Sequence, residues 1–347
     1  MFKKKILCTS LLFCAFSLTA SASQVYLDEF QALGTNITSQ VKADTEEKAQ
    51  FCQKVIKDET LRLEQLLSAY IPTSDISKLG TSNGNWVEVS PDTVEILDLT
   101  KDICEITDGA LDPTVGTLVK LWSVDHPNHR VPSTEEISEA LKKVDYKQIQ
   151  TKKEGDKYYA KIGKGQEITL GATGKGFIAD KIAQKLRANE CNNALVSLGG
   201  NIITLGTNGR GDPWFIGIQE PDLKRGRNFA AVPSKDESVV TSGDYEKFFI
   251  KDGKKYHHIL NPKTGEPVPA TLSSVTIINK NSGYADGLCT ALFVMGWDGA
   301  LKFLVEHPEL KAVLIDEKLE HAAATDNLKG DLYVIEPLYQ VGFIRKE

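Results

Sequence analysis

The sequence Thr169-Leu-Gly-Ala-Thr-Gly-Lys-Gly-Phe177 lies between two different patterns. At its start, residues 167–170 form a short β-branched run, which indicates a strand. After it, apolar residues recur at helical spacing, at Ile178, Ile182, Ala183 and Leu186. This part of the chain therefore predicts a strand, a glycine loop and a helix in direct succession.

The glycine loop has the chemistry of an anion-binding site. Glycines let a backbone approach a ligand closely, and the first turn of a helix offers unpaired N–H groups and the positive end of the helix dipole. Lys175 would add a full positive charge. The loop is not a Walker A sequence, because its glycines are spaced differently and Gly176 follows the lysine where Ser or Thr is required. For the loop taken alone, a tight turn with a solvated lysine is at least as good an interpretation.

The first 22 residues have the pattern of a secretory signal peptide. Residues 1–5 form a basic n-region, residues 6–18 an apolar h-region too short for a stable membrane anchor, and residues 20–22 a small-residue cleavage site. We therefore expect cleavage of this segment and an exported, periplasmic protein. A lipoprotein anchored through Cys14 is the less favoured alternative, because the bulky Phe13 precedes that cysteine.

Length and composition allow residues 23–347 to form either one large globular domain or two. The 347-residue sequence is 41% hydrophobic, enough for a large core, and has no repeat, low-complexity tract or long linker. Its net charge is −6, and removal of three lysines with the signal peptide would lower it to about −9. This excess of acidic groups argues against nucleic acid as a partner.

Four cysteines remain after the predicted cleavage: Cys52, Cys104, Cys191 and Cys289. They are widely spaced and form no CxxC pair, so a zinc site is not expected. The favoured interpretation is that each is a small buried hydrophobic residue. One disulfide is also compatible with an oxidising compartment, but the spacing does not identify the pair.

Capping signals and periodicity predict an α+β fold. Asp44 with Glu47 and Ser133 with Glu136 resemble capping boxes, and Ser90-Pro91 is a typical helix start. The helix after Asp44 would be long and amphipathic and end at residues 71–72. Strands are expected at residues 26–41 (a pair), 194–198, 202–205, 214–218, 229–232, 238–241, 248–250, 256–260 and 273–278. Their mixed patterns predict a mixed sheet with helices packed on it.

A second candidate site lies on the helix predicted for residues 285–295. Asp286 and Thr290 are four residues apart, so their oxygen-bearing side chains project from one face of that helix. Mg²⁺ prefers oxygen ligands and often completes its shell with substrate phosphates. The plainer interpretation is that Asp286 complements the helix dipole and that Thr290 lies on the helix surface.

Eight ordered motifs, spread over nearly the whole mature chain, resemble those of the ApbE family of FAD:protein FMN transferases. Any one of them would be weak, but eight in order make a specific signal. The motifs are Leu33-Gly-Thr35, Leu67-Ser-Ala-Tyr70, residues 108–116, residues 171–177 with Asp180, Ser197-Leu-Gly-Gly-Asn201, Thr241-Ser-Gly-Asp-Tyr245, His258-Ile-Leu-Asn-Pro262 with Thr264-Gly265, and Ala285-Asp-Gly-Leu-Cys-Thr290.

The resemblance implies one domain of ApbE-like (T-fold-like) architecture over residues 23–347 and an enzyme that binds FAD with Mg²⁺. Such an enzyme transfers FMN to a threonine or serine hydroxyl of a target protein, and AMP leaves. Carried over motif by motif, the resemblance implies that the backbone carbonyl of Ala172 and the side chains of Asp286 and Thr290 hold the metal. The implied FAD site is lined by Leu33, Tyr70, Leu111, Asp112, Pro113, Thr169, Lys175, His258 and Leu260. Asp112 before Pro113 is also typical of a purely structural turn.

His258 is the favoured candidate for the base that accepts the hydroxyl proton, because the unperturbed pKa of histidine lies near neutrality. Asp244 and Asp286 are less favoured candidates. A structural histidine bonded to a neighbouring carbonyl is the alternative role for His258. Neighbouring His257 would point to the opposite face of a strand and is expected to be exposed.

Two other functions remain open from the sequence. In an FAD pyrophosphatase, water would replace the protein hydroxyl and the products would be FMN and AMP. A non-catalytic periplasmic flavin-binding protein would release no AMP. For a transferase, the resemblance implies an acceptor in a membrane redox complex, such as the sodium-pumping NADH:quinone reductase or its Rnf-type relative.

Overall fold

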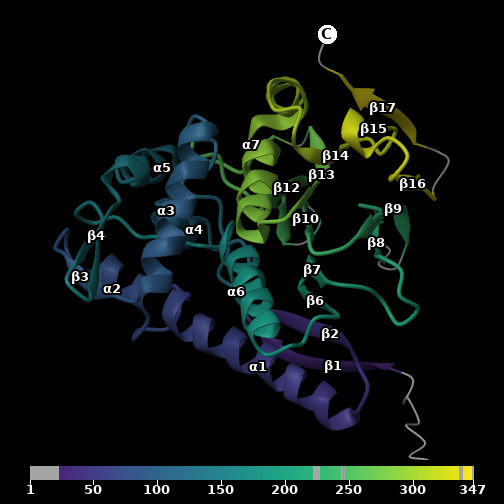
Figure 1. Ribbon diagram of the computed structural model, residues 1–347. Coiled ribbons are helices and arrows are strands. Elements are labelled where there is room, and N and C mark those ends of the chain that lie inside the picture. The colour runs from purple at the N-terminus through teal and green to yellow at the C-terminus, as the bar shows by residue number, and fades with distance from the viewer. Residues whose placement is uncertain are drawn as a thin grey trace, which may run out of the picture.

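A nine-stranded sheet runs through the middle of the protein. The computed structural model describes residues 23–221, 227–243, 245, 247–269, 271–335 and 339–345, so the predicted signal peptide and Asp244 lie outside the described residues. The strand order is β1-β2-β6-β7-β10-β13-β14-β15-β17 (Figure 1). Every neighbouring pair is antiparallel except β15 and β17, which are parallel, so the predicted mixed sheet is confirmed. The strands are β1 (Gln24–Ala32), β2 (Thr35–Ala43), β6 (Ala194–Leu198), β7 (Asn201–Leu205), β10 (Ser238–Gly243), β13 (Leu272–Asn279), β14 (Lys311–Asp316), β15 (His321–Thr325) and β17 (Gln340–Ile344).

Three long helices pack along this sheet, with α6 between the other two (Figure 1). They are α1 (Glu46–Leu67), α6 (Gly174–Ala188) and α7 (Ser282–Glu306), and α3 (Pro91–Ile106) packs against α7. By length and composition α7 is apolar enough to cross a membrane. Its residues Leu288 and Leu292 are fully buried against the same cluster as Val275 and Ile277 of β13, as expected for the central helix of a folded core.

Smaller sheets and helices complete the domain. Strands β8 (Trp214–Gln219), β9 (Asn228–Ser234) and β16 (Tyr333–Val334) form a sheet whose apolar side chains pack against Ile278, Val313 and Ile315 of the large sheet. Strands β11 (Phe248–Lys251) and β12 (Lys254–His257) form a separate hairpin. The remaining elements are α2 (Asp75–Thr81), β3 (Val87–Val89), α4 (Gly116–Trp122), α5 (Thr134–Leu141), η1 (Tyr146–Gln148), β4 (Gln150–Glu154), β5 (Lys157–Lys161) and η2 (Asp326–Leu328).

The helix starts follow local chemistry. Ser133 and Glu136 form the predicted capping box of α5, and Ser90 caps α3 with Pro91 in its first turn. At α1 the predicted cap is wrong by one residue: the Thr45 hydroxyl, rather than the Asp44 carboxylate, accepts from the N–H of Lys48. Helix α1 also ends at Leu67, earlier than the proline predicts, because the backbone of Ser68 is already extended.

Two of the four cysteines form a disulfide. Cys52 of α1 is bonded to Cys191, which follows α6, and the two are 139 residues apart in sequence. The favoured interpretation as a buried thiol is therefore wrong for these two residues and confirmed for Cys104 and Cys289. Cross-links over loops of this length stabilise a fold by about 2–5 kcal/mol, mainly by restricting the unfolded chain. The bond fastens α1 to α6, two of the three helices that pack along the sheet.

Candidate functional site

The glycine loop lies directly against α7. The N–H of Gly176 donates to Oδ2 of Asp286 at 2.9 Å, across 110 residues of sequence. A Cβ at Gly176 would lie 2.2 Å from the backbone oxygen of Ser282, so only glycine fits here. The hydroxyl groups of Thr173, at the start of α6, and Thr100, on α3, are also hydrogen-bonded to each other at 3.0 Å. The two candidate sites found in the sequence are therefore parts of one site.

Asp180 holds the first turn of α7 against α6. Its two carboxylate oxygens accept from the backbone N–H groups of Ser282 at 2.9 Å and Gly283 at 2.8 Å. Burial raises the pKa of Asp180 to about 6, although both hydrogen bonds favour the charged form. This carboxylate satisfies N–H groups that a helix start otherwise leaves unpaired. It therefore fixes the position of Asp286, which lies one turn further along α7.

Asp286 is a buried carboxylate surrounded by groups that favour its charge. Only 2% of the residue is exposed, and burial raises the pKa of its carboxyl, while Lys175, the N–H of Gly176 and the amide of Asn201 act in the opposite direction. Nδ2 of Asn201 is buried and makes no hydrogen bond of standard geometry to the described residues. The amide thus faces the Asp286 carboxylate without a hydrogen bond of standard geometry, and a buried donor of this kind beside a lysine suits a ligand oxygen. The sequence reasoning did not select Asn201, although the glycine pair before it was a usable signal.

Leu33 lies in the turn next to the one that carries Asn201. Strands β2 and β6 are neighbours, and a Cβ at Gly199, whose φ is +60°, would lie 2.5 Å from Oγ1 of Thr35. Leu33 itself has a φ of 56°, which is uncommon for a non-glycine residue and is often found at functional sites. Its N–H donates to Oε1 of Glu64 on α1 at 2.7 Å, which holds this turn against the last part of the helix.

Tyr70 follows α1 and is 80% exposed. A tyrosine ring is large and mostly apolar, so a ring this exposed in a folded domain is available to stack on a planar ligand. Because Tyr70 comes six residues after Glu64, it extends from the same end of α1 that holds Leu33.

The segment around Pro113 runs beside residues 167–170, which lead into the glycine loop. The prediction of a strand there is wrong, because Glu167 forms only an isolated bridge with Val115 and residues 168–170 belong to no strand. The N–H of Thr169 donates to the carbonyl of Pro113 at 2.8 Å. The carboxylate of Asp112 is buried and accepts from the N–H and hydroxyl of Thr114 and from the N–H of Tyr146. Its side chain therefore stabilises the turn, the structural role that the sequence also allowed, while Leu111 is buried in the core cluster that includes α7 residues. Pro113 is the member of this segment that reaches the loop.

The two adjacent histidines have different environments. His257 is 2% exposed; its Nε2 donates to the carbonyl of Val268 at 2.9 Å and its Nδ1 accepts from the N–H of Ile259 at 3.2 Å. The prediction that His257 is exposed is therefore wrong, because the strand face opposite His258 packs into the core. Both of its ring nitrogens are already bonded, which suits a structural role.

His258 is partly exposed and has one ring nitrogen left for chemistry. Its Nδ1 lies 3.1 Å from the carbonyl of Lys247, so Nδ1 carries the proton of the neutral ring and Nε2 remains the basic nitrogen. Burial of the ring lowers the pKa of His258 to about 4; the hydrogen bond to the Lys247 carbonyl acts against this shift, and the charges of Lys247 and Lys175 act with it. The ring is therefore neutral at pH 7 and lies within electrostatic reach of Lys175. Leu260, two residues on, is buried beneath this segment with Leu118 of α4.

The oxygen donors at this site fit a hard cation. Thr290 lies one turn after Asp286 on α7 and is partly exposed, and Ala172 of the loop packs against the core cluster that contains Ala285 and Leu288. Among the residues that the structure describes, no three His, Cys, Asp or Glu side chains form a metal cluster. A metal here would combine one carboxylate with hydroxyl and carbonyl oxygens and take further ligands from substrate, which is the usual pattern for Mg²⁺.

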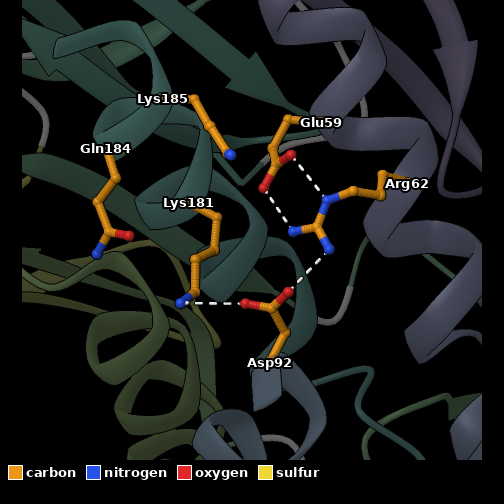
Figure 2. A pocket seen from close by; sticks show the side chains of 6 residues that line it. All are labelled: Glu59, Arg62, Asp92, Lys181, Gln184 and Lys185. Atoms are coloured by element: carbon orange, nitrogen blue, oxygen red, sulfur yellow. Dashed lines mark hydrogen bonds and ion pairs between the residues drawn. The ribbon is translucent and has the colours of Figure 1, made fainter. Parts of the chain in front are cut away.

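A separate cavity of about 430 Å³ lies between α1, α3 and α6 (Figure 2). Figure 2 shows that its charged side chains are turned toward one another: Arg62 contacts Glu59 at 2.7 Å and Asp92 at 2.8 Å, and Lys181 contacts Asp92 at 3.2 Å. These contacts lower the pKa of Asp92 despite its partial burial. These ion pairs connect three helices. They account for the charged side chains at the cavity, so the charges give no reason to expect a ligand there.

Together the fold and the site define a protein in which a lysine-bearing glycine loop packs against a buried carboxylate. A family model described as the ApbE family matches residues 33–314. The chain therefore belongs to the ApbE family, and the mixed α+β architecture predicted from the sequence is that of ApbE structures.

Named relatives and solved structures agree with this assignment. The chain is 36% identical to an FAD:protein FMN transferase of Treponema pallidum over 73% of each sequence, and 30% identical to one of Klebsiella pneumoniae over 85% of this chain and 90% of the relative. A crystal structure of the ApbE protein from Thermotoga maritima superposes with a TM-score of 0.81 at 33% identity, covering 89% of this chain and 99% of that one.

The close packing of the loop on α7 predicts different effects for two glycines of the same loop. Gly176→Ala should lower the free energy of unfolding by about 1–3 kcal/mol, because its methyl group would collide with backbone atoms of α7. Gly171→Ala is the matched control, since its nearest contact would be an ordinary 3.5 Å to a side chain. Chemical denaturation of both variants measures the difference, and equal stabilities would contradict the close contact between loop and α7.

Proposed function

We propose that this protein is a Mg²⁺-dependent FAD:protein FMN transferase. It would attach FMN to a threonine or serine hydroxyl of an acceptor flavoprotein and release AMP. The observation that carries the proposal is the direct contact of Gly176 with Asp286, with Lys175 within electrostatic reach of the carboxylate. The names of the Treponema pallidum and Klebsiella pneumoniae relatives support the same reaction.

FAD would bind with its pyrophosphate at the glycine loop. The positive end of α6 and the charge of Lys175 suit an anion there, and the buried Nδ2 of Asn201 supplies a further donor. Leu33 and the exposed ring of Tyr70 offer apolar surface at the end of α1 for the planar part of the flavin. Pro113, Thr169 and the segment from His258 to Leu260 would complete the lining.

Mg²⁺ would be held by Asp286, Thr290 and the carbonyl of Ala172. When bound it would neutralise charge on the phosphate oxygens, as metal ions do in phosphoryl transfer. Asp286 is already fixed for this task, because Gly176 orients its Oδ2 and Asp180 anchors the helix that carries it. Fixed positions of this kind lower the reorganisation needed in the transition state.

The chemical step exchanges a phosphoanhydride bond of FAD for a phosphoester bond to the acceptor. The acceptor hydroxyl oxygen attacks the phosphorus on the FMN side of the pyrophosphate, and the bond from that phosphorus to the bridging oxygen breaks. AMP leaves with the bridging oxygen. The hydroxyl proton passes to Nε2 of His258, the ring nitrogen that is not bonded to Lys247. Lys175 stabilises the charge that develops on the phosphate oxygens.

We further propose that the protein acts outside the cytoplasm, on a subunit of a sodium-pumping NADH:quinone reductase or Rnf-type complex. The disulfide between Cys52 and Cys191 supports export, because disulfides persist in oxidising compartments. The signal-like pattern of residues 1–22 agrees with it. The acceptor type follows from the resemblance to the ApbE family.

Mass spectrometry of an acceptor tests the function. With FAD and Mg²⁺, the purified flavin-carrying domain of a sodium-pumping NADH:quinone reductase should gain the mass of one FMN less one water, with one AMP released. Asp286→Asn keeps the size of the side chain but removes its charge, and should reduce transfer by at least about 100-fold. Release of AMP with no labelled acceptor would instead identify an FAD pyrophosphatase, and FAD binding without AMP would identify a flavin-binding protein.

The pH dependence of transfer tests His258 as the base. A base must be neutral to accept a proton, and a pKa of about 4 keeps His258 neutral above about pH 5. We therefore expect kcat/KM for FAD to be unaffected by this group from pH 5 to 8 and to fall only as the pH approaches 4. His258→Gln should lower the rate by about 100-fold or more. An acidic limb centred near pH 6.5 in the wild type, or full activity in the variant, would contradict the assignment.

A further inference from the structure

The β11–β12 hairpin is a basic projection on an acidic protein. Residues 247–257 contain four lysines and one aspartate, a net charge of about +3, whereas the whole chain carries −6. Lys247 is paired with Asp125 at 3.1 Å, but Lys251 and Lys254 lie opposite each other at the exposed turn. A local excess of one charge sign on a protein of opposite net charge favours a partner of the complementary sign.

One face of the hairpin fixes it to the body of the protein. Phe249 and Tyr256 are cross-strand partners with ring centroids 5.1 Å apart, and they contact His129 at 4.4 Å and Trp122 at 5.7 Å respectively. Trp122, Phe249 and the partly buried Tyr256 belong to a cluster with residues of α4 and α5, whereas His129 is exposed. The hairpin is therefore presented in a defined orientation, which lowers the entropy cost of binding a partner.

The opposite face carries an apolar side chain in solvent. Ile250 is 66% exposed and pairs across the hairpin with Lys255, whose ammonium lies 4.8 Å from the centroid of the Phe248 ring. An exposed isoleucine beside Lys255 and close to the lysines of the turn is a suitable contact for a protein segment that combines acidic residues with an apolar one. A single large apolar side chain offers little for insertion into a lipid bilayer.

The hairpin leads directly to the proposed base. Strand β12 ends at the buried His257, and the next residue is His258, whose N–H and Nδ1 both contact the carbonyl of Lys247 just before β11. The base is therefore held at the root of the hairpin. A protein segment bound along the hairpin would bring its neighbouring residues to His258, where an acceptor hydroxyl is required.

We propose that the exposed turn end of the β11–β12 hairpin, where Lys251 and Lys254 project from one face and Ile250 from the other, is the docking surface for the acceptor protein. This inference rests on the proposed transferase function. The surface binds an acidic segment of the acceptor beside the residue that is flavinylated. This surface contributes to association with the acceptor and not to the binding of FAD. A change in it should therefore alter the affinity for the acceptor and leave the affinity for FAD unchanged.

A charge-reversal variant tests this surface. The purified flavin-carrying domain of a sodium-pumping NADH:quinone reductase serves as the acceptor, and FAD affinity is measured in parallel by flavin fluorescence. K251E/K254E should lower kcat/KM for the acceptor by about tenfold or more and leave the FAD affinity unchanged, because charges at an interface act mainly on association. K318E/K329E changes two exposed lysines near β14 and β15 and is the matched control. The wild-type kcat/KM should fall with added salt, and that of K251E/K254E should not.

Each outcome bears on a different claim. Equal loss in both double variants, or no loss in K251E/K254E while the wild type labels the acceptor, would overturn the docking surface alone. Loss of binding to vesicles that contain anionic phospholipid, with unchanged transfer to the soluble acceptor, would overturn it in favour of a membrane-binding role. A wild-type protein that releases AMP without labelling the acceptor would overturn the transferase function and with it the docking surface.

Discussion

The hydrogen bond from the Gly176 N–H to the Asp286 carboxylate is the contact on which the rest of the site depends. It joins the first turn of α6 to the first part of α7 in a buried environment, where a carboxylate is stable only with donors or cations around it. Gly176 makes the approach sterically feasible, Asp180 anchors the start of α7, and Lys175 supplies charge. The same arrangement that stabilises the carboxylate also brings together the groups that would bind a pyrophosphate in the proposed function.

The sheet brings the remaining parts of the site to this contact. The β1–β2 and β6–β7 turns carry Leu33 and Asn201, and the pairing of β2 with β6 places these turns side by side. Leu33 keeps a positive φ because Glu64 of α1 binds its N–H. The disulfide from Cys52 and the ion pairs of Arg62 then fix α1 relative to α6 and α3. The strained backbone of Leu33 is thus stabilised by contacts with α1 that lie outside the candidate site, a common arrangement at binding sites.

Much of the fold was predictable because its signals are local. Capping residues such as Ser90 and Ser133 act within one turn, and the β-branched and glycine-rich segments mark strands and turns without reference to distant residues. The wrongly predicted cap of α1 also has a local cause. Thr45 and Asp44 are both residue types that cap helices well, and hydrophobic periodicity cannot distinguish between two adjacent positions. Only tertiary pairing decided which cysteines are bonded.

The site was less predictable, because its contacts join distant segments. Asp286 and Lys175 were recognisable as candidates from residue type, but nothing in either segment encodes the hydrogen bond between Gly176 and Asp286, and the family resemblance supplied the link. His257 and His258 show the limit of strand alternation: it separates two faces but does not say which face is buried. Asn201 was missed because an unpartnered buried amide can be seen only when its surroundings are known.

The most direct test of the account is the position of a metal ion in a crystal grown with FAD and Mn²⁺ in place of Mg²⁺. Anomalous scattering should reveal an ion about 2 Å from oxygens of Asp286 and Thr290 and from the carbonyl of Ala172, with the FAD phosphates between it and Lys175. An ion bound elsewhere, or a pyrophosphate that contacts neither Lys175 nor the ion held by Asp286, would contradict it.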